Sequence, residues 1–407
     1  MQLDRRSFIG LAGAFGLGAA VGVPSTLAAT SGFAAMAGGS SVPFYGKYQA
    51  GITTPMQDRL YFAAFNVETE DTAQLKRVLK EWTLAAERMS RGTDAGPIGA
   101  ASGMPEAPPD DTGEALDLPA ARVTMTIGFG PSIFDSRFGF ASRKPAGFEK
   151  LPTFARDELE SEQQNADLMI QVCADDDQVA FHAIRNLIRI AKGTISPVWL
   201  QSGFSGAAKT SASRHTPRNL FGFKDGTANL NVDDFTETQM HLWVDRGWMT
   251  NGTYMAVRNF RFDIETWDRS SLVEQEQVFG RTKGAGAPLS GGSEFSQPDF
   301  KAKNARGELA IAEDSHMALA HPSKHGGAKI LRRAFNYSNG TDRVARIDAG
   351  LLFISYQKDL EKQFVPIQRA LANNDQMNEY VTVIGSSTYA CPPGLAPGEF
   401  WGHQLFA

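Results

Sequence analysis

The chain has 407 residues, a formal net charge of −5 at pH 7 and two cysteines. This mildly acidic balance excludes nucleic acid and anionic membrane surfaces as the main partners, because both attract basic proteins. Cys173 and Cys391 form no CxxC pattern, which excludes a cysteine-ligated metal site. They form either one disulfide of an oxidising compartment or two buried thiols, and the second alternative is favoured.

The first residues predict an export signal. Arg5 and Arg6 stand directly before an apolar run, Phe8–Val23, which is shorter than the ~20 residues needed to cross a bilayer. We therefore predict a twin-arginine signal peptide over residues 1–37, with a tethered N-terminal helix as the alternative. Residues 1–37 carry Asp4, Arg5 and Arg6, so their removal changes the net charge from −5 to −6. We expect a periplasmic or extracytoplasmic protein, exported in the folded state, with no stable membrane insertion after signal removal.

The mature chain of about 370 residues is long enough for two domains. Residues 38–58 predict an extended arm. The following residues, 59–205, show strand-like runs and helical spacing in the order β-α-β-β-α-β, which is typical of a ferredoxin-like domain. The predicted strands cover 60–67, 122–128, 167–174 and 195–201, and the predicted helices begin at 71–72 and at 175–177.

The last part, 206–407, repeats this order and predicts a second ferredoxin-like domain. Its predicted strands cover 253–263, 334–338, 350–356 and 381–389, and its predicted helices cover 267–279 and 359–371. An insertion of about 50 residues precedes the strand at 334, and an insertion of this length is usually functional or disordered. We therefore expect an α+β fold of the dimeric α+β barrel type, with a site built by the connector near residue 225 and by the insertion.

One candidate for chemistry is Asp225, which lies in the glycine-containing run 221–229. Glycine lets the backbone approach a ligand closely, so the carboxylate of Asp225 can project over a bound group. The alternative for the same run is a plain turn.

A second candidate is the histidine cluster of the insertion, His316, His321 and His325. Pro322 and Ser323 separate the last two histidines, which argues against a zinc site on one helix face. Haem iron needs only a single proximal histidine. The opposite haem face then needs an acid/base group, for which Asp225 is available, and a positive charge, for which Arg332 or Arg333 is available.

Segments along nearly the whole mature chain resemble the dye-decolourising peroxidases, in particular the exported branch that includes the deferrochelatase/peroxidase of bacterial ferrous-iron uptake systems. The run Gly222 to Gly226 matches the GxxDG signature of that family. The other matching segments are 44–46, 49–52, 128–130, 134–135, 267–269, 274–276, 280–289, 314–316, 331–333 and 350–353. The resemblance implies two ferredoxin-like modules, with one haem b per chain held by the C-terminal half.

The resemblance also implies roles for single residues. His316 is expected as the proximal iron ligand, Asp225 as the distal acid/base group and Arg332 as the distal arginine. An acidic residue orients the proximal imidazole, and Asp348 and Asp359 are the two candidates. The residues expected to line the haem, in addition to Arg332, are Gly226, Thr227, Ala228, His321, Pro322 and Ser323.

The proximal segment departs from the family pattern. Relatives typically read His-Ile-Arg-Leu-Ala-Asn-Pro-Arg, whereas this chain has no arginine between His316 and Ser323, and His321 replaces the asparagine. If those arginines hold the haem propionates, haem affinity is lower here, or Lys324 and His325 compensate. His321 is also an alternative iron ligand.

Three functions are therefore open. The first is a haem peroxidase that reduces hydrogen peroxide and oxidises organic donors one electron at a time. The second is a deferrochelatase that releases iron from haem, with ferrous-iron uptake components as partners. The third is a periplasmic haem carrier without catalysis. A homo-oligomer is expected for all three.

Overall fold

The computed structural model describes residues 41–206 and 216–406. The predicted signal peptide lies outside the described residues, and the boundaries predicted for the arm and for the two halves stay predictions. Across the described part of the chain, no helix has the length and apolar character needed to cross a membrane.

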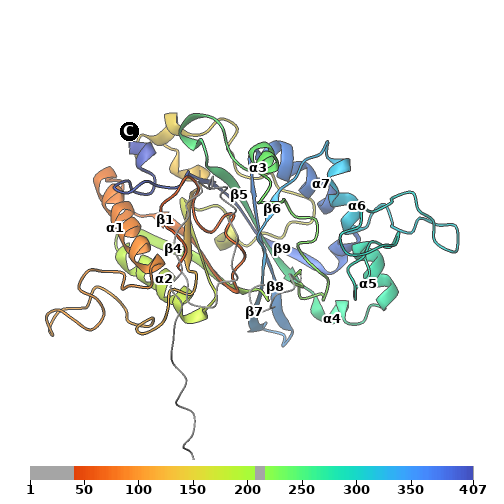
Figure 1. The fold of residues 1–407 in the computed structure, drawn as a ribbon, viewed down its shortest axis with the longest axis horizontal. Helices are drawn as coiled ribbons and strands as arrows, with labels where there is room; N and C mark the ends of the chain where they lie inside the picture. Colours follow the sequence, from red (N-terminus) through yellow and green to blue (C-terminus); the bar gives the residue numbers. More distant parts are fainter. Residues whose placement is uncertain (1–40, 207–215, 407) are drawn as a thin grey trace, which may run out of the picture. The chain divides into compact units, whose positions relative to one another are not determined.

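Eight antiparallel strands form a closed barrel (Figure 1). The short strand β6 pairs with the same edge of β8 as β7 does, directly before β7 in the chain. The order around the ring is β5-β9-β2-β3-β1-β4-β7-β8, and β8 pairs again with β5. The strands are β1 (Arg59–Val67), β2 (Thr124–Phe129), β3 (Leu168–Ala174), β4 (Ile195–Phe204), β5 (Thr253–Phe262), β6 (Leu331–Arg332), β7 (Phe335–Thr341), β8 (Ile347–Gln357) and β9 (Val381–Cys391).

Each half of the ring has the strand order of a ferredoxin-like domain. Read in one direction around the ring, the first half is β2-β3-β1-β4 and the second is β7-β8-β5-β9, so both have the order 2-3-1-4 when the strands of each half are counted along the chain. The halves meet at the pairs Phe204–Asn336 and Phe129–Ala390. The fold predicted from the sequence is therefore confirmed.

Successive side chains along each strand point alternately to the inside and to the outside of the barrel. In β1, Leu60 and Phe62 belong to the cluster inside the barrel, whereas Ala63 and Phe65 belong to the cluster on the outer face. The two cysteines also lie in the inner cluster as buried free thiols, so they form no disulfide with each other.

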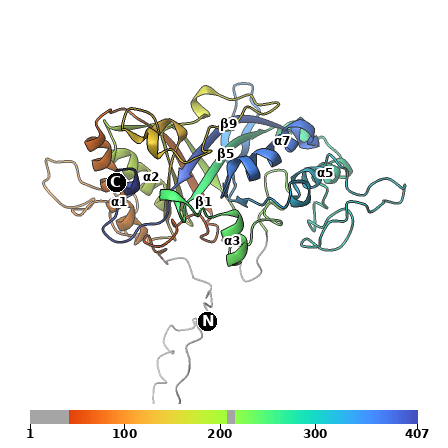
Figure 2. The same cartoon turned by 90° about the horizontal axis from the view of Figure 1, so that it is seen from above.

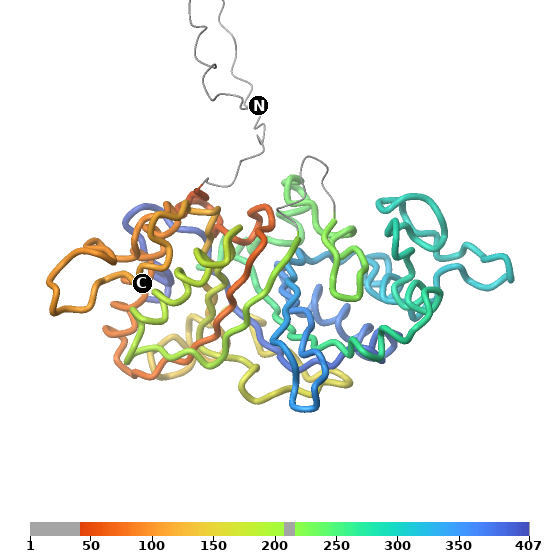
Figure 3. Tube along the Cα trace, turned by 90° about the horizontal axis from the view of Figure 1, so that it is seen from below, coloured from red at the N-terminus to blue at the C-terminus, as the bar shows by residue number. Residues whose placement is uncertain are grey.

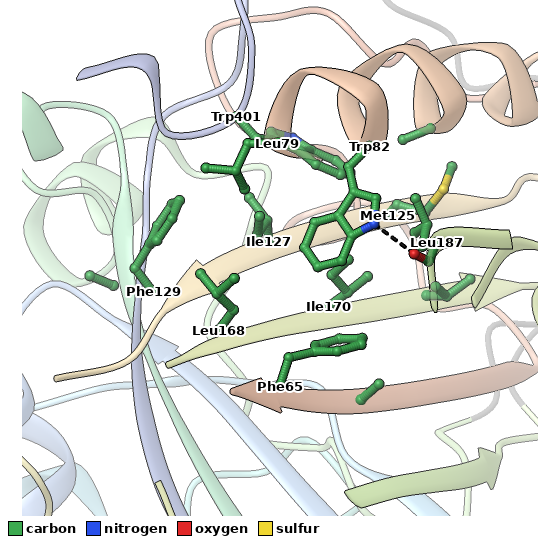
Figure 4. Close-up of a cluster of buried hydrophobic side chains, with 14 of the residues drawn as sticks. Phe65, Leu79, Trp82, Met125, Ile127, Phe129, Leu168, Ile170, Leu187 and Trp401 are labelled. Carbon is green, nitrogen blue, oxygen red and sulfur yellow. Dashed lines mark hydrogen bonds between the residues drawn. The ribbon is translucent and has the colours of Figure 1, made fainter. Parts of the chain in front are cut away.

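Two long helices cover the outer face of the first half, α1 (Thr72–Ser90) and α2 (Asp177–Ile190). Asp71 and Asp176 cap their N-termini by accepting backbone N–H groups. The indole Nε1 of Trp82 donates to the carbonyl oxygen of Leu187 at 2.7 Å, which joins the two helices above the core (Figure 4). The C-terminal end of the chain lies near α1, since Trp401 N–H donates to Thr83 Oγ1 at 2.9 Å (Figure 2).

The second half has shorter helices, which lie on the side of the strands away from α1 and α2 (Figures 1 and 3). They are α3 (Phe235–His241), α4 (Ile264–Trp267), α5 (Leu272–Phe279), α6 (His316–Ala320) and α7 (Val365–Asn374), with a π-helical turn at Leu360–Phe364 before α7. The prediction of one helix over 267–279 was wrong. Asp263 and Ser271 each cap a helix start by accepting a backbone N–H, so the segment contains two helices instead of one.

The arm before β1 contains no helix or strand in its described part, 41–58. Two buried glutamines fasten it to the barrel. Gln49 bonds to the backbone of Ile127 on β2 and to the carbonyl oxygen of Pro392, and Gln57 bonds to Thr124.

Candidate haem site

The loop that carries Asp225 needs two of its glycines for conformational reasons. Gly222 and Gly226 have φ values of 83° and 136°, which other residues adopt only with strain. A Cβ atom at Gly222 would also lie 2.9 Å from the Lys283 side chain of the insertion. The backbone N–H of Asp225 donates to Pro217 O at 2.8 Å, so the loop presents this carboxylate from a fixed turn.

The structure brings Asp225 and Arg332 together. Arg332 Nη1 donates to Asp225 Oδ1 at 2.9 Å, although the two residues are 107 positions apart in the sequence. Their side chains are 23% and 25% exposed, so the pair remains accessible from a cavity. The neighbouring Arg333 is only 5% exposed and points elsewhere, with its guanidinium bonded to Thr54 O and Gln57. Of the two arginines left open by the sequence, Arg332 is therefore the one beside Asp225.

His316 begins helix α6, and its partner is an aspartate that the sequence did not indicate. Nδ1 of His316 lies 2.6 Å from Asp375 Oδ2, and Asp375 is held at the end of α7, where its Oδ1 accepts from Met377 N–H at 2.9 Å. Both predicted orienting residues were wrong. Asp348 contacts Asn339, and Asp359 caps the π-helical turn by accepting from Lys362 N–H.

The pKa of His316 responds to its aspartate partner and to Asp225 and Arg332, which we call the distal pair. Burial opposes the charged imidazole, but the carboxylate of Asp375 and, more weakly, that of Asp225 raise the pKa of His316, while Arg332 opposes this rise. Asp225 and Arg332 therefore lie near enough to His316 to influence the charge of its ring. The His316 side chain is 33% exposed. Its Nε2 is therefore the ring nitrogen left to bind a ligand, since Nδ1 is bound to Asp375.

The distal pair lines a cavity of about 300 Å³. The lining includes Phe204, Asn336 and Leu351 from strands β4, β7 and β8. It also includes Gly226 and Arg218 from the loop that carries the GxxDG signature, residues 216–229, which we call the signature loop. The residues present fit haem. A carboxylate-oriented imidazole is a suitable axial ligand, and an aspartate–arginine pair beside a partly apolar cavity provides the polar groups for the other face.

The insertion is tied to the signature loop through Glu294. Its carboxylate binds Lys224 Nζ and the hydroxyls of Thr216 and Thr227, the last at 3.0 Å. Burial alone raises the pKa of Glu294, but Lys224 and the two threonines lower it below its ordinary value. The sequence analysis missed Glu294, because no spacing connects it to residues about 70 positions away.

Arg281 is a further residue that the sequence analysis missed. Its Nη1 donates to the carbonyl oxygens of Gly286 and Glu294 at 2.7 and 2.9 Å, so its charge is held by backbone groups. Burial and the nearby Arg332 lower the pKa of Arg281, and the carboxylate of Glu294 opposes this decrease. Burial and, in addition, Arg281 lower the pKa of His321, so the charge of Arg281 acts on both the distal arginine and the segment after His316.

The residues after His316 adopt a compact turn. His321 ends α6 and accepts at Nδ1 from Ser323 N–H at 3.3 Å, which leaves the ring proton of neutral His321 on Nε2. The turn Pro322–Lys324 follows. Nε2 of His325 lies 2.6 Å from Leu319 O, so this histidine is turned towards the backbone.

Comparisons with known proteins identify the family of the chain. The chain matches the family models described as Dyp-type peroxidase, N-terminal, over residues 49–205 and Dyp-type peroxidase, C-terminal, over residues 216–396. It is 37% identical over 373 residues to the Deferrochelatase of Escherichia coli (strain K12), which covers 89% of this chain and 86% of the relative.

Two solved structures extend the comparison to the fold. An oxyferrous complex of DtpA from Streptomyces lividans is 35% identical with a TM-score of 0.85, and the match covers 91% of this chain and 98% of DtpA. A DyP-type peroxidase from Cellulomonas bogoriensis is 37% identical with a TM-score of 0.81, and the match covers 90% of this chain and 98% of that one. The chain therefore belongs to the Dyp-type peroxidase family and is a haem-dependent peroxidase.

Proposed function

We propose that His316, Asp225 and Arg332 are the working residues of a haem b site that reduces hydrogen peroxide and oxidises organic donors. One observation carries this proposal. The Asp225–Arg332 pair, closed at 2.9 Å, lines a cavity and acts electrostatically on the carboxylate-oriented His316.

Bound haem supplies the iron that takes up peroxide and exchanges single electrons with the donor. Asp225 accepts a proton from the peroxide and returns it to the far oxygen, which leaves as water. Arg332 stabilises the negative charge that develops on the departing oxygen. Asp375 keeps the proton of His316 on Nδ1, so that Nε2 presents its lone pair to the iron.

The residues proposed to line the haem belong to two segments, of which Gly226 lines the cavity beside Asp225 and Arg332. Gly226, Thr227 and Ala228 follow Asp225 in the signature loop, and Thr227 is fixed by its bond to Glu294. His321, Pro322 and Ser323 follow the proximal helix as one turn. We propose Arg281 as the positive charge for a haem propionate, in place of the arginines missing from the proximal segment.

The distal roles are tested by stopped-flow mixing of haem-loaded protein with peroxide. Asp225→Asn and Arg332→Leu are each expected to slow the peroxide reaction about 10²–10⁴-fold while the Soret band is retained, because each removes one group of the proton-transfer step. Asp233→Asn is the matched control, since Asp233 is an exposed aspartate eight residues further along the chain. Parent rates in both distal variants would sink the distal assignment.

The proximal role has a separate readout. His316→Ala is expected to lose iron ligation, which shows as loss or displacement of the Soret band before any peroxide is added. An unchanged spectrum means that His316 is not the ligand, and His321→Ala then tests the alternative.

A second candidate function is iron release from haem, because the 37% identical relative is named Deferrochelatase. Haem-loaded protein is treated with peroxide, with and without a donor dye, and iron and protoporphyrin are assayed. Oxidised dye with intact haem supports the peroxidase function, whereas free iron with protoporphyrin supports the deferrochelatase function. Weak peroxide reactivity with reversible haem transfer supports a haem carrier.

We further propose that the protein is exported in the folded state to the periplasm by the twin-arginine pathway. There it acts with ferrous-iron uptake components as partners, and it forms a homo-oligomer. The adjacent Arg5 and Arg6 support the export route. Replacing both with lysine is expected to leave the protein in the cytoplasm, which cell fractionation measures. Light scattering after gel filtration gives the oligomeric state.

A further inference from the structure

We propose that Asn229 is a positioning residue, whose side-chain amide holds the backbone of Arg332 so that its guanidinium meets Asp225. This inference rests on the distal roles proposed above for Asp225 and Arg332. It concerns a residue to which the sequence analysis gave no role.

The amide of Asn229 makes two hydrogen bonds to the same residue. Its Nδ2 donates to the carbonyl oxygen of Arg332 at 2.8 Å, and its Oδ1 accepts from the N–H of Arg332 at 2.8 Å. A neighbouring antiparallel strand would offer this same pair of groups. The side chain of Asn229 therefore replaces a strand at the outer edge of β6.

The other edge of β6 is paired with β8. Arg332 stands opposite Ser355, and the N–H of the following Arg333 donates to Ile354 O at 2.8 Å. Because β6 contains only Leu331 and Arg332, it has few backbone hydrogen bonds of its own. The two bonds from Asn229 are consequently a large share of what fixes the Arg332 backbone.

The signature loop thus holds Arg332 at both ends. Asn229 binds the backbone, where the side chain starts, and Asp225 binds the guanidinium at 2.9 Å, where the side chain ends. Asn229 is itself immobilised, because its Oδ1 also accepts from Leu230 N–H at 3.0 Å and Leu230 is only 5% exposed in the inner core. A shift of the amide would move Arg332 relative to Asp225.

Only an amide of this length provides both groups. Aspartate has the acceptor for the Arg332 N–H but no donor for the carbonyl oxygen, and alanine has neither. Asn229→Asp and Asn229→Ala therefore remove one and two of the contacts, respectively.

The test is a double-mutant cycle on the peroxide reaction of haem-loaded protein. Asn229→Ala is expected to slow this reaction about tenfold in the parent background. In the Arg332→Leu background it is expected to cause no further loss, because its effect passes through the missing guanidinium. Donor oxidation at saturating peroxide is expected to keep its parent rate, since that step does not use Arg332.

The outcomes separate this inference from the proposed function. Parent rates for Asp225→Asn and Arg332→Leu mean that the proposed function fails. Two outcomes overturn the positioning role alone. In the first, Arg332→Leu slows the peroxide reaction but Asn229→Ala reacts at the parent rate. In the second, Asn229→Ala slows the reaction by the same factor in the parent and in the Arg332→Leu background. If Asn229→Ala does not retain haem, Asn229→Asp is measured in its place, and a parent rate there overturns the role. Asn231→Ala is the matched control, because Asn231 is an exposed asparagine two residues away.

Discussion

The two halves of the barrel have the same strand order but differ in what covers their outer faces. In the first half, α1 with 19 residues and α2 with 14 residues pack over the strands. In the second half, the corresponding first helix is divided into α4 and α5, with four and eight residues, and the long insertion follows before β7.

This difference decides where the chemistry lies. The outer face of the first half is a continuous apolar core, whereas polar groups such as Asn336 and Arg332 stand on the outer face of β6–β8 and line a cavity. The proposed haem site therefore lies in the half with the shorter helical layer, while both halves keep the same strand order. We expect the first half to contribute more to stability and the second half to carry the reactivity.

The largest expected effect tests the first half. Trp82 is fully buried and bonds to Leu187 O, so Trp82→Ala is expected to lower the free energy of unfolding by about 3–5 kcal/mol through cavity formation and a lost hydrogen bond. Arg332→Leu, at a partly exposed position, is expected to change it by less than about 0.5 kcal/mol. Denaturant titrations compare the two. A larger loss for Arg332→Leu would reverse the assignment of stability to the first half.

The next effect concerns the proximal side of the second half. Asp375→Ala is expected to weaken haem retention and slow the peroxide reaction about 10–100-fold, because the imidazole loses the partner that sets its orientation and tautomer. Asp348→Asn is the control, since Asp348 accepts a hydrogen bond from Asn339, whereas the partner of His316 is Asp375. Equal behaviour of the two variants would mean that Asp375 does not orient the haem ligand.

The contrast between the halves also explains what the sequence could predict. All the long barrel strands were predicted from alternation and helical spacing, because each buries an apolar face that leaves a local pattern. Helix α1 was predicted in the same way, from Leu75, Val78 and Trp82 at helical spacing above a capping aspartate. The prediction for the segment 267–279 failed, because two helices that meet at a capped turn show the same spacing of apolar residues as one continuous helix.

The candidate site was predicted less well, because its contacts join distant segments. Asp225, Arg332 and His316 were candidates from the residues alone, but their specific roles came from the family resemblance, because no local pattern connects them. Asp375 was missed, since it lies 59 residues after His316 at the end of a helix, where an aspartate is also an ordinary capping residue. Asn229 was missed for a related reason, because a bond from a side chain to a distant backbone leaves no trace in composition.

A smaller effect tests a titrating contact of the first half. Burial alone raises the pKa of Asp111, but bonds from Ala95 N–H at 2.6 Å, from His182 at 3.0 Å and from Gly113 N–H at 2.7 Å lower it below the ordinary value. A carboxyl group with a lowered folded-state pKa stabilises the fold above its unfolded pKa of ~4, and this contribution is lost as the pH falls through the folded value.

Asp111→Asn is therefore expected to cost about 1–3 kcal/mol of unfolding free energy at neutral pH. The difference from the parent should shrink as the pH falls below ~4, because Asp111 is protonated first in the unfolded state and then, at lower pH, in the folded state. Unfolding titrations at several pH values measure this difference in unfolding free energy, with Glu106→Gln as the control, because Glu106 is exposed. A difference that stays constant with pH would show that the ionised carboxylate is not what holds the loop to α2.

The smallest effect expected here concerns the cation of the second half. Arg281→Leu is expected to lower haem affinity about tenfold, the size of one charge-assisted hydrogen bond to a propionate. The parent residue lies close enough to Arg332 and His321 to act on both, so an anion there relieves the repulsion between the two arginines. Haem titrations of Arg281→Leu and of the exposed Arg306→Leu, from the same insertion, make the comparison. If Lys324→Met lowers the affinity and Arg281→Leu does not, the propionate is held by the turn after His316, and Arg281 is not an anion-binding group.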